Sequence, residues 1–158
     1  MLTRNFMTTL GNNYAMKLDN IPTYIYNKSG NYIGNTESSF GSSGNYPFAA
    51  QWSVSTFKIG TGTTLPKSSD FKLENEITSG YDCGTLSKRY VQGEEKDYIN
   101  IYGNITNNSD SPITFSELGW FVQAGTSSVN TLLFAREVYD TPITIAPGES
   151  VAVNVNLM

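Results

Sequence analysis

The chain has 158 residues, of which 15% are charged and 13% aromatic, and its formal net charge is −4. This length predicts one domain, residues 1–158, with a substantial core. The ten basic residues are scattered over an acidic chain, which argues against nucleic-acid binding because phosphate contacts need clustered Lys and Arg. The chain contains no histidine, the side chain most often used for acid–base catalysis at neutral pH.

The number of cysteines and the hydropathy of the chain indicate the compartment in which it is made. Cys83 is the single cysteine, so no disulfide can form within the chain, and synthesis in a reducing compartment is expected. No apolar run approaches the ~18 residues that a membrane span needs. The first residues contain no apolar stretch of the kind found in secretory signals. We therefore expect no membrane association.

The first eleven residues predict a short helix. Leu2, Phe6 and Leu10 recur every four positions and share one stripe, and Gly11 follows as a stop signal. So short a helix must dock on something. It could cover an edge of its own domain or lie on a neighbouring subunit, and residues 1–11 are therefore a candidate docking segment.

A small hairpin and a long loop come next. Tyr24 and Tyr26 lie on one face of a strand that pairs, across a turn at 28–31, with a strand at 32–33. Residues 34–46 have turn composition throughout and predict a long loop rather than a linker, because the aromatic residues on both sides need one core.

The middle of the chain predicts a strand, a loop and a turn of helix. Residues 51–59 form the strand, and a bulge near 55–56 would bring its apolar residues to one side. Residues 60–66 are a loop. Ser68 to Asp70 offer N-caps for one short helical turn that carries Phe71, Leu73 and Ile77.

From Tyr98 onward apolar and polar residues alternate. Ile99, Ile101 and Ile105 are expected to face the core, with Tyr98 and Tyr102 opposite. Later inward positions are Leu118, Trp120, Val122, Val151, Val153, Val155 and Leu157. Pro147 and Gly148 predict a type II turn before the last strand. The fold class is therefore mainly all-β, an antiparallel β-sandwich of jelly-roll or immunoglobulin-like type with the two brief helical segments.

Catalytic, cofactor and metal sites are not predicted. The carboxylates that a glycosidase-type reaction could use are Glu74, Glu76, Glu94, Glu95, Asp110 and Glu117, and none lies in a context that predicts burial. A zinc site is not expected, because the chain has one cysteine and no histidine to act as ligands. A calcium site in the loop at 107–110 would be weak, because the loop offers one carboxylate among amides. The Gly60–Gly62 segment lacks the spacing of a nucleotide loop. We expect no enzyme.

The tyrosines are the candidate binding residues. Tyr24 and Tyr26 share one strand face, and Tyr98 and Tyr102 share another. Flat aromatic side chains on an open sheet face suit sugar stacking or a protein interface, unless a second sheet or a helix covers them. The predicted interface therefore comprises Leu2, Phe6, Leu10, Tyr24, Tyr26, Tyr98 and Tyr102.

Several motifs resemble those of small virion proteins of tailed bacteriophages, including tail-collar, fibre-type and capsid-decoration modules. They are Gly-Thr-Gly-Thr-Thr at 60–64, Leu-Glu-Asn-Glu-Ile at 73–77, Ser-Glu-Leu-Gly-Trp-Phe at 116–121, Leu-Phe-Ala-Arg at 133–136, and Pro-Gly-Glu at 147–149. The resemblance covers about two-thirds of the chain, and Trp120 stands where the family has Leu.

The resemblance implies a structural component of the virion, synthesised in the host bacterial cytoplasm, that forms homo-oligomers and docks on other virion proteins of the tail, neck or capsid. It implies no catalytic residues and no cofactor. The alternative function is a carbohydrate-binding module for attachment to host-surface glycans through the tyrosine faces.

Overall fold

The computed structural model describes residues 1–2, 24–26, 29–30, 32–35, 50–92, 97–124 and 131–157. By its internal contacts the chain divides into two compact units. Unit 1 comprises residues 1–55, 66–72 and 121–136. Unit 2 comprises residues 56–65, 73–120 and 137–158. The predicted helix over 1–11 lies outside the described residues, apart from its first two.

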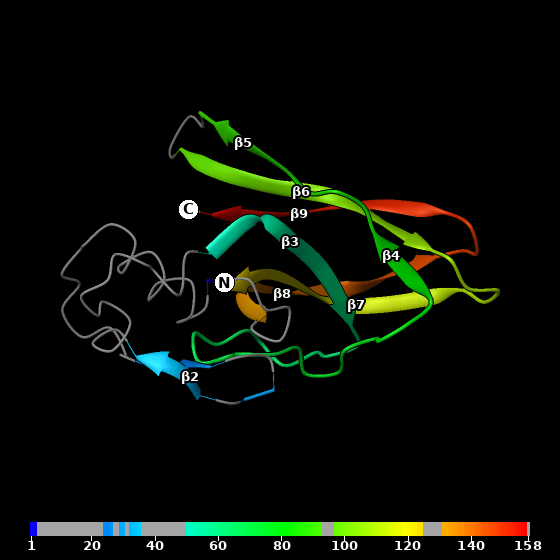
Figure 1. Ribbon diagram of the computed structural model, residues 1–158. Coiled ribbons are helices and arrows are strands. Elements are labelled where there is room, and N and C mark those ends of the chain that lie inside the picture. Colours follow the sequence, from blue (N-terminus) through cyan, green and yellow to red (C-terminus); the bar gives the residue numbers. More distant parts are fainter. Residues whose placement is uncertain are drawn as a thin grey trace. The chain divides into compact units, whose positions relative to one another are not determined.

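The described residues contain nine strands and no helix (Figure 1). A two-stranded antiparallel sheet pairs β1 with β2, as the predicted hairpin requires, and a three-stranded sheet has the order β3-β7-β8. A four-stranded sheet joins β4, β5, β6 and β9. The strands are β1 Tyr24–Tyr26, β2 Tyr32–Asn35, β3 Ala50–Gly60, β4 Tyr81–Cys83, β5 Ser87–Val91, β6 Tyr98–Asn107, β7 Ile113–Ala124, β8 Thr131–Ile145 and β9 Ser150–Leu157. Strand β2 includes the first two residues of the predicted 34–46 loop, and residues 36–46 lie outside the description.

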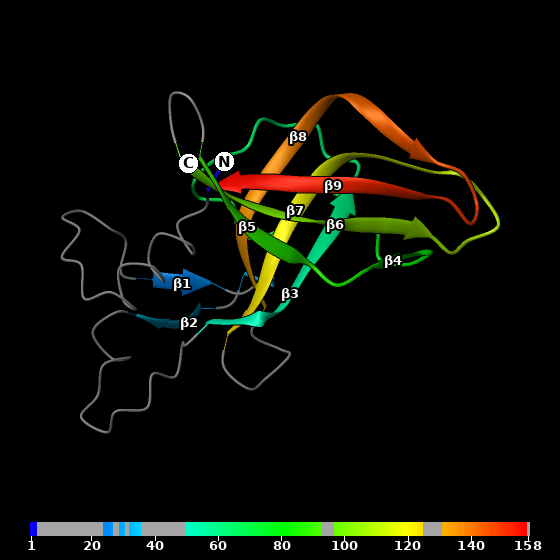
Figure 2. The same cartoon turned by 90° about the horizontal axis from the view of Figure 1, so that it is seen from above.

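Strand β6 is the centre of the four-stranded sheet. It pairs with β9 over Ile99–Thr106 and with β5 over Tyr98–Tyr102, so these two strands lie on its opposite edges. Strand β4 pairs with Ile105–Asn107 on the same edge as β5. Figures 1 and 2 both show β6 and β9 side by side. All of these pairs are antiparallel, as the sequence predicts.

In unit 2 the two larger sheets pack together as a sandwich. The ends of β3, β7 and β8 that belong to this unit contribute one layer, and β6 and β9 contribute the other. Strand β9 alternates as predicted, with three buried inward residues and Val151 half-buried. The main buried side chains of this unit are Phe57, Ile59, Leu73, Ile101, Ile105, Phe115, Leu118, Trp120, Ile145, Val153, Val155 and Leu157.

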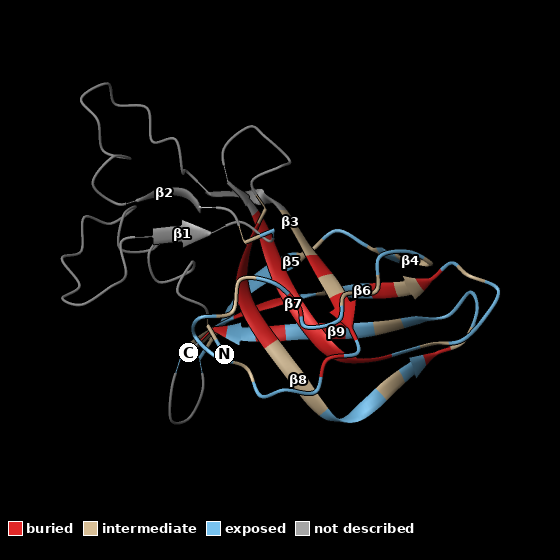
Figure 3. Cartoon of the chain, turned by 90° about the horizontal axis from the view of Figure 1, so that it is seen from below, coloured by how far each residue is buried: buried red, intermediate tan, exposed pale blue. Residues whose placement is uncertain are grey.

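Strand β7 is buried without a break from Phe115 to Val122 (Figure 3). Leu118, Trp120 and Val122 are buried, as the sequence predicts for core residues. The residues between them are buried too, because β7 is the middle strand of its sheet and both of its faces are covered. Simple alternation therefore underestimates burial in this strand.

Ile99 departs from the predicted core. It shares the inner side of β6 with Ile101, yet 43% of its surface is exposed. It stands at the second position of the strand, and its partner Tyr90 on β5 is also exposed. The end of the sheet thus leaves inward-pointing apolar side chains in contact with solvent.

The predicted helical turn after Ser68 is wrong. The nitrogen of Asp70 donates to the carbonyl oxygen of Lys67 and closes a single turn, but the chain beyond it is irregular. The Ile77 nitrogen donates to the Ile59 carbonyl oxygen instead of a carbonyl four residues earlier. A helix cannot form here because tertiary partners take the backbone hydrogen bonds that it needs.

The predicted type II turn is confirmed. The nitrogen of Glu149 donates to the Ala146 carbonyl oxygen at 3.0 Å. Gly148 has a φ of +75° at the third turn position, where type II geometry requires a positive value.

Candidate functional site

The Gly-Thr-Gly-Thr-Thr loop presents four consecutive backbone N–H groups to acceptors within the chain. Thr61 donates to the Asn75 carbonyl oxygen at 2.9 Å, and Gly62 donates to the Glu117 carboxylate at 3.3 Å. Thr63 and Thr64 both donate to the Glu74 carboxylate, at 3.1 and 3.0 Å. Backbone amides that converge in this way can bind an anion. Here acceptors of the protein itself, two carboxylates and one backbone carbonyl group, take that place.

Glu117 is the buried centre of this arrangement. Its side chain comes from β7 and is 0% exposed. Its carboxylate also accepts from the backbone nitrogens of Glu74 at 2.8 Å and Asn75 at 3.4 Å. The sequence-based expectation that no carboxyl group lies in a buried context is therefore wrong for Glu117. Its oxygens accept from backbone donors, so its role is to hold Gly62, Glu74 and Asn75 against β7.

Two of the other candidate carboxylates, Glu74 and Glu76, have structural partners as well. Glu76 forms an ion pair with Lys58, and Glu74 accepts the hydroxyl of Thr64 at 2.8 Å. Asp110 is exposed, and Glu94 and Glu95 lie outside the described residues. The described part of the chain contains no group of three or more His, Cys, Asp or Glu side chains that could hold a metal ion.

The loop at 107–110, which the sequence made only a weak calcium candidate, is organised by the amide side chain of Asn107. Asn107 is buried, and its Oδ1 accepts from the backbone nitrogen of Ser109 at 2.9 Å and from the Ser109 hydroxyl at 2.7 Å. Its Nδ2 donates to the carbonyl oxygens of Ser111 and Ile145. The side chain thus joins the β6–β7 turn to the end of β8.

Unit 1 contains a buried ion pair. The Arg136 guanidinium donates to the Asp70 carboxylate at 2.9 Å, and Arg136 is 3% exposed. Asp70 also accepts from the Lys67 nitrogen. The Leu-Phe-Ala-Arg motif at 133–136 is therefore linked to Asp70 through its arginine.

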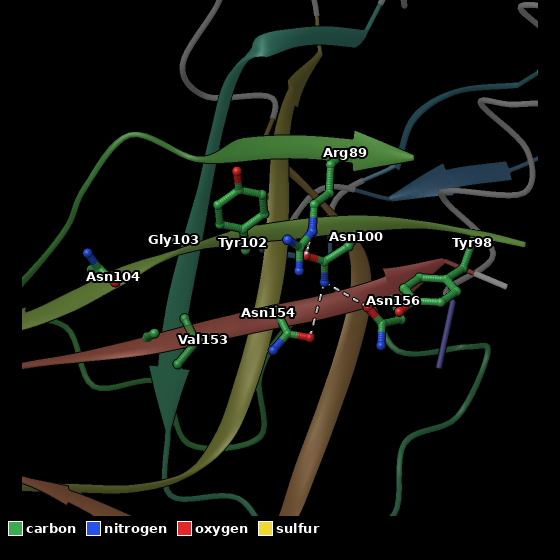
Figure 4. A pocket seen from close by; sticks show the side chains of 10 residues that line it. Arg89, Tyr98, Asn100, Tyr102, Gly103, Asn104, Val153, Asn154 and Asn156 are labelled. Carbon is green, nitrogen blue, oxygen red and sulfur yellow. Dashed lines mark hydrogen bonds between the residues drawn. The ribbon is translucent and has the colours of Figure 1, made fainter. Parts of the chain in front are cut away.

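The outer face of the four-stranded sheet carries an open groove of about 330 Å³ (Figure 4). Strand β6 contributes Tyr98, Asn100, Tyr102, Gly103 and Asn104. Strand β9 contributes Ala152, Val153, Asn154 and Asn156, and β5 contributes Arg89. We call this surface the Tyr–Asn groove.

A chain of hydrogen bonds crosses the Tyr–Asn groove. Arg89 Nε donates to Asn100 Oδ1 at 3.2 Å, and the Arg89 guanidinium lies 5.2 Å from the centre of the Tyr102 ring. Asn100 Nδ2 donates to the Oδ1 atoms of Asn154 and Asn156, at 3.3 and 2.7 Å. The groove is therefore an ordered polar surface, since each of these side chains is held by its neighbours.

The predicted interface residues are placed differently from one another. Tyr102, with 40% of its surface exposed, and half-buried Tyr98 lie together at the Tyr–Asn groove. Leu2 is half-buried and forms a β-bridge with Ala135 of β8, so it packs on its own chain. Tyr24 and Tyr26 belong to β1, but their side chains are not described. Phe6 and Leu10 lie outside the described residues.

Sequence reasoning missed Arg89 and Asn100 as groove residues. Lys88 and Arg89 are both exposed on the edge strand β5. A usable signal was the polar side of β9, where Asn154 and Asn156 alternate with valines. Only the register between β6 and β9 brings Asn100 beside both.

No protein-family model, curated protein or solved structure matches this chain. Among the described residues, no helix has the length and apolar character needed to cross a bilayer.

Proposed function

We propose that this chain is a structural component of a tailed-bacteriophage virion, which self-assembles and docks on other virion proteins of the tail, neck or capsid. We further propose that its sandwich is of the jelly-roll or immunoglobulin-like type. The observation that supports this function is the contact among three sequence motifs that resemble those of phage virion proteins. The motifs at 60–64 and 73–77 are held to the motif at 116–121 by the buried Glu117 carboxylate.

This contact gives the motifs a physical purpose. A buried carboxylate is costly unless hydrogen bonds compensate for its lost hydration, and Glu117 receives three of them from one irregular segment. The result is a loop with a defined backbone that needs no cofactor. A preordered loop loses little conformational entropy when a neighbouring subunit binds it.

Leu65 is the side chain that this loop offers to a neighbour. It directly follows the four bonded amides, and 76% of its surface is exposed. An apolar side chain on a preordered loop can be buried by a partner subunit at low entropic cost. We propose the loop around Leu65 as a docking element in addition to residues 1–11, and we propose the predicted loop 34–46 as a further one.

Particle incorporation tests the proposal. Purified particles of the phage that encodes this chain should contain it, and light scattering of the isolated protein should show an oligomer. Leu65→Ser should leave the urea midpoint unchanged and deplete the protein from particles, whereas the apolar control Leu65→Met should incorporate normally. A monomeric protein that purified particles lack would refute the proposal.

A second candidate function is attachment to a host-surface carbohydrate. The specific observation in its favour is the Tyr–Asn groove, where two tyrosines and several amides face solvent on one sheet. Aromatic rings and amides are the side chains that stack on sugar rings and bond their hydroxyl groups. Loss of glycan binding in Tyr98→Ala and Tyr102→Ala would support it.

A further inference from the structure

We propose that the Tyr–Asn groove binds an acidic saccharide, a sugar chain that bears carboxylate groups. The inference rests on the second candidate function and specifies its ligand. It comes from the direction of the hydrogen bonds in the groove, from the charge of the lining side chains, and from the position of the groove on the sheet.

The Arg89 side chain determines the direction of the three hydrogen bonds that cross the Tyr–Asn groove. A guanidinium can only donate, so the Asn100 atom that faces Arg89 Nε must be the acceptor Oδ1. Asn100 Nδ2 then faces Asn154 and Asn156, whose nearer atoms must both be Oδ1. Figure 4 shows the Nδ2 atoms of Asn154 and Asn156 turned away from Asn100. The groove therefore presents amide donors.

The groove is also positively charged, which favours the same acceptor-rich ligands as the amide donors do. Arg89 is the only charged side chain among the ten lining residues, in a chain whose net charge is −4. Among the hydrogen bonds of the described residues, Asn100 engages only Nε of Arg89. The two Nη groups can therefore receive both oxygens of a carboxylate. A ligand rich in acceptors and negatively charged complements this surface.

The tyrosines supply the apolar part of the site. Tyr98 and Tyr102 stand on the same side of β6, four residues and therefore about 14 Å apart at ~3.4 Å per residue. Asn100 lies between them (Figure 4). A short oligosaccharide can place sugar faces on the rings and a carboxylate near Arg89 between them.

The position of the groove favours a saccharide over an acidic peptide. Extended peptides add to the edge of a sheet, where backbone N–H and C=O groups are available. The Tyr–Asn groove lies on the face of the sheet across β5, β6 and β9, and its polar groups are side chains. Such a surface can match hydroxyl and carboxylate groups without a partner strand.

Calorimetric titration of the full chain with uronic-acid oligosaccharides tests the inference. The probes are trimers of galacturonate and of glucuronate, a sialylated trisaccharide, and the methyl esters of all three. We expect at least one acid to bind roughly tenfold or more tightly than its ester, the size of one hydrogen bond to a charged group. Added salt should weaken binding of the acid more than binding of the ester.

Three variants show whether the groove is responsible. Arg89→Gln should remove the preference for the acid, Asn154→Asp should weaken the acid through repulsion, and Tyr102→Ala should weaken acid and ester alike. The matched control is Lys88→Gln, because Lys88 pairs with Ile101 and points to the other side of the sheet. An unchanged urea midpoint shows that each variant is folded.

Equal affinity for acid and ester, absence of binding across the panel, or binding that Arg89→Gln leaves intact would overturn the inference. Binding of a tri-glutamate peptide without any sugar would replace it with protein docking. The virion proposal fails separately, through absence of the chain from particles. If the Arg89→Gln variant enters particles normally and the parent protein binds no glycan, only the saccharide site is refuted.

Discussion

The carboxylate of Glu117 accepts a hydrogen bond from the backbone nitrogen of Gly62 at 3.3 Å, across 55 positions of the chain. The contact is buried, and Ser116, the preceding residue, donates its hydroxyl to the Gly62 carbonyl oxygen at 3.1 Å. Both polar groups of the Gly62 backbone are thus held by adjacent side chains of β7. The loop geometry therefore depends on these two side chains of a distant strand.

Glu117→Gln should destabilise the fold by about 1–3 kcal/mol, the cost of leaving a buried donor without its acceptor. Both oxygens of the carboxylate accept backbone N–H groups, and a glutamine would turn an N–H₂ group toward one of these donors. Urea denaturation measures the effect. Glu149→Gln, at an exposed position, is the control and should leave the midpoint unchanged.

Gly62→Ala should also destabilise the fold, by about 1–3 kcal/mol as an overpacking change. A Cβ at this position would lie 2.6 Å from Glu74 Cβ and 2.7 Å from a Glu117 carboxylate oxygen. Gly84→Ala is the matched control, because its nearest atom would be 3.8 Å away. Equal urea midpoints for the two variants would contradict the close packing of the loop.

Asp70→Asn should weaken the fold by about 1–3 kcal/mol, because it removes the charge opposite a buried guanidinium. Arg136 is almost fully buried, whereas Asp70 is partly exposed. The substitution therefore leaves the positive charge in the interior. Thermal unfolding should reveal the loss, and the exposed Asp110→Asn should not reproduce it.

Glu137→Gln should stabilise the protein at neutral pH. Burial raises the pKa of the Glu137 carboxyl group above its usual value, so between the unfolded and folded pKa values the folded state holds more protons. Stability then falls as pH rises through this window, starting near 4.5. The urea midpoint of Glu137→Gln should exceed that of the parent at pH 7 and equal it at pH 3. A constant difference at both pH values would refute this explanation.

Much of the sheet structure could be predicted because it depends on short-range patterns. The alternation from Val151 to Leu157 and the Pro147–Gly148 turn match the structure. The side of β6 that bears Tyr98 and Tyr102 was also predicted correctly. The predicted helical turn after Ser68 was wrong, because a capping preference is a local property. The backbone N–H groups of residues 74, 75 and 77 donate to other segments of the chain instead.

The candidate site could be predicted only in part. Tyr102 was found because it alternates with isoleucines, but Arg89 belongs to a separate strand with no pattern of its own. The local sequence gives no sign that Glu117 is buried, since a glutamate between Ser116 and Leu118 is ordinarily expected to be exposed. Its burial follows from coverage of both faces of β7.

The amino-acid sequence by itself determined the strand class, the inward residues of β6 and β9, and a surface poor in charge, because each depends on residue type and a period of two. Tertiary structure alone decided which amide meets which carboxylate at Glu117 and which asparagines meet at Asn100. The physical reason is register: a hydrogen bond between strands exists only after two distant segments have been aligned, and a shift of one residue would turn every side chain to the other face.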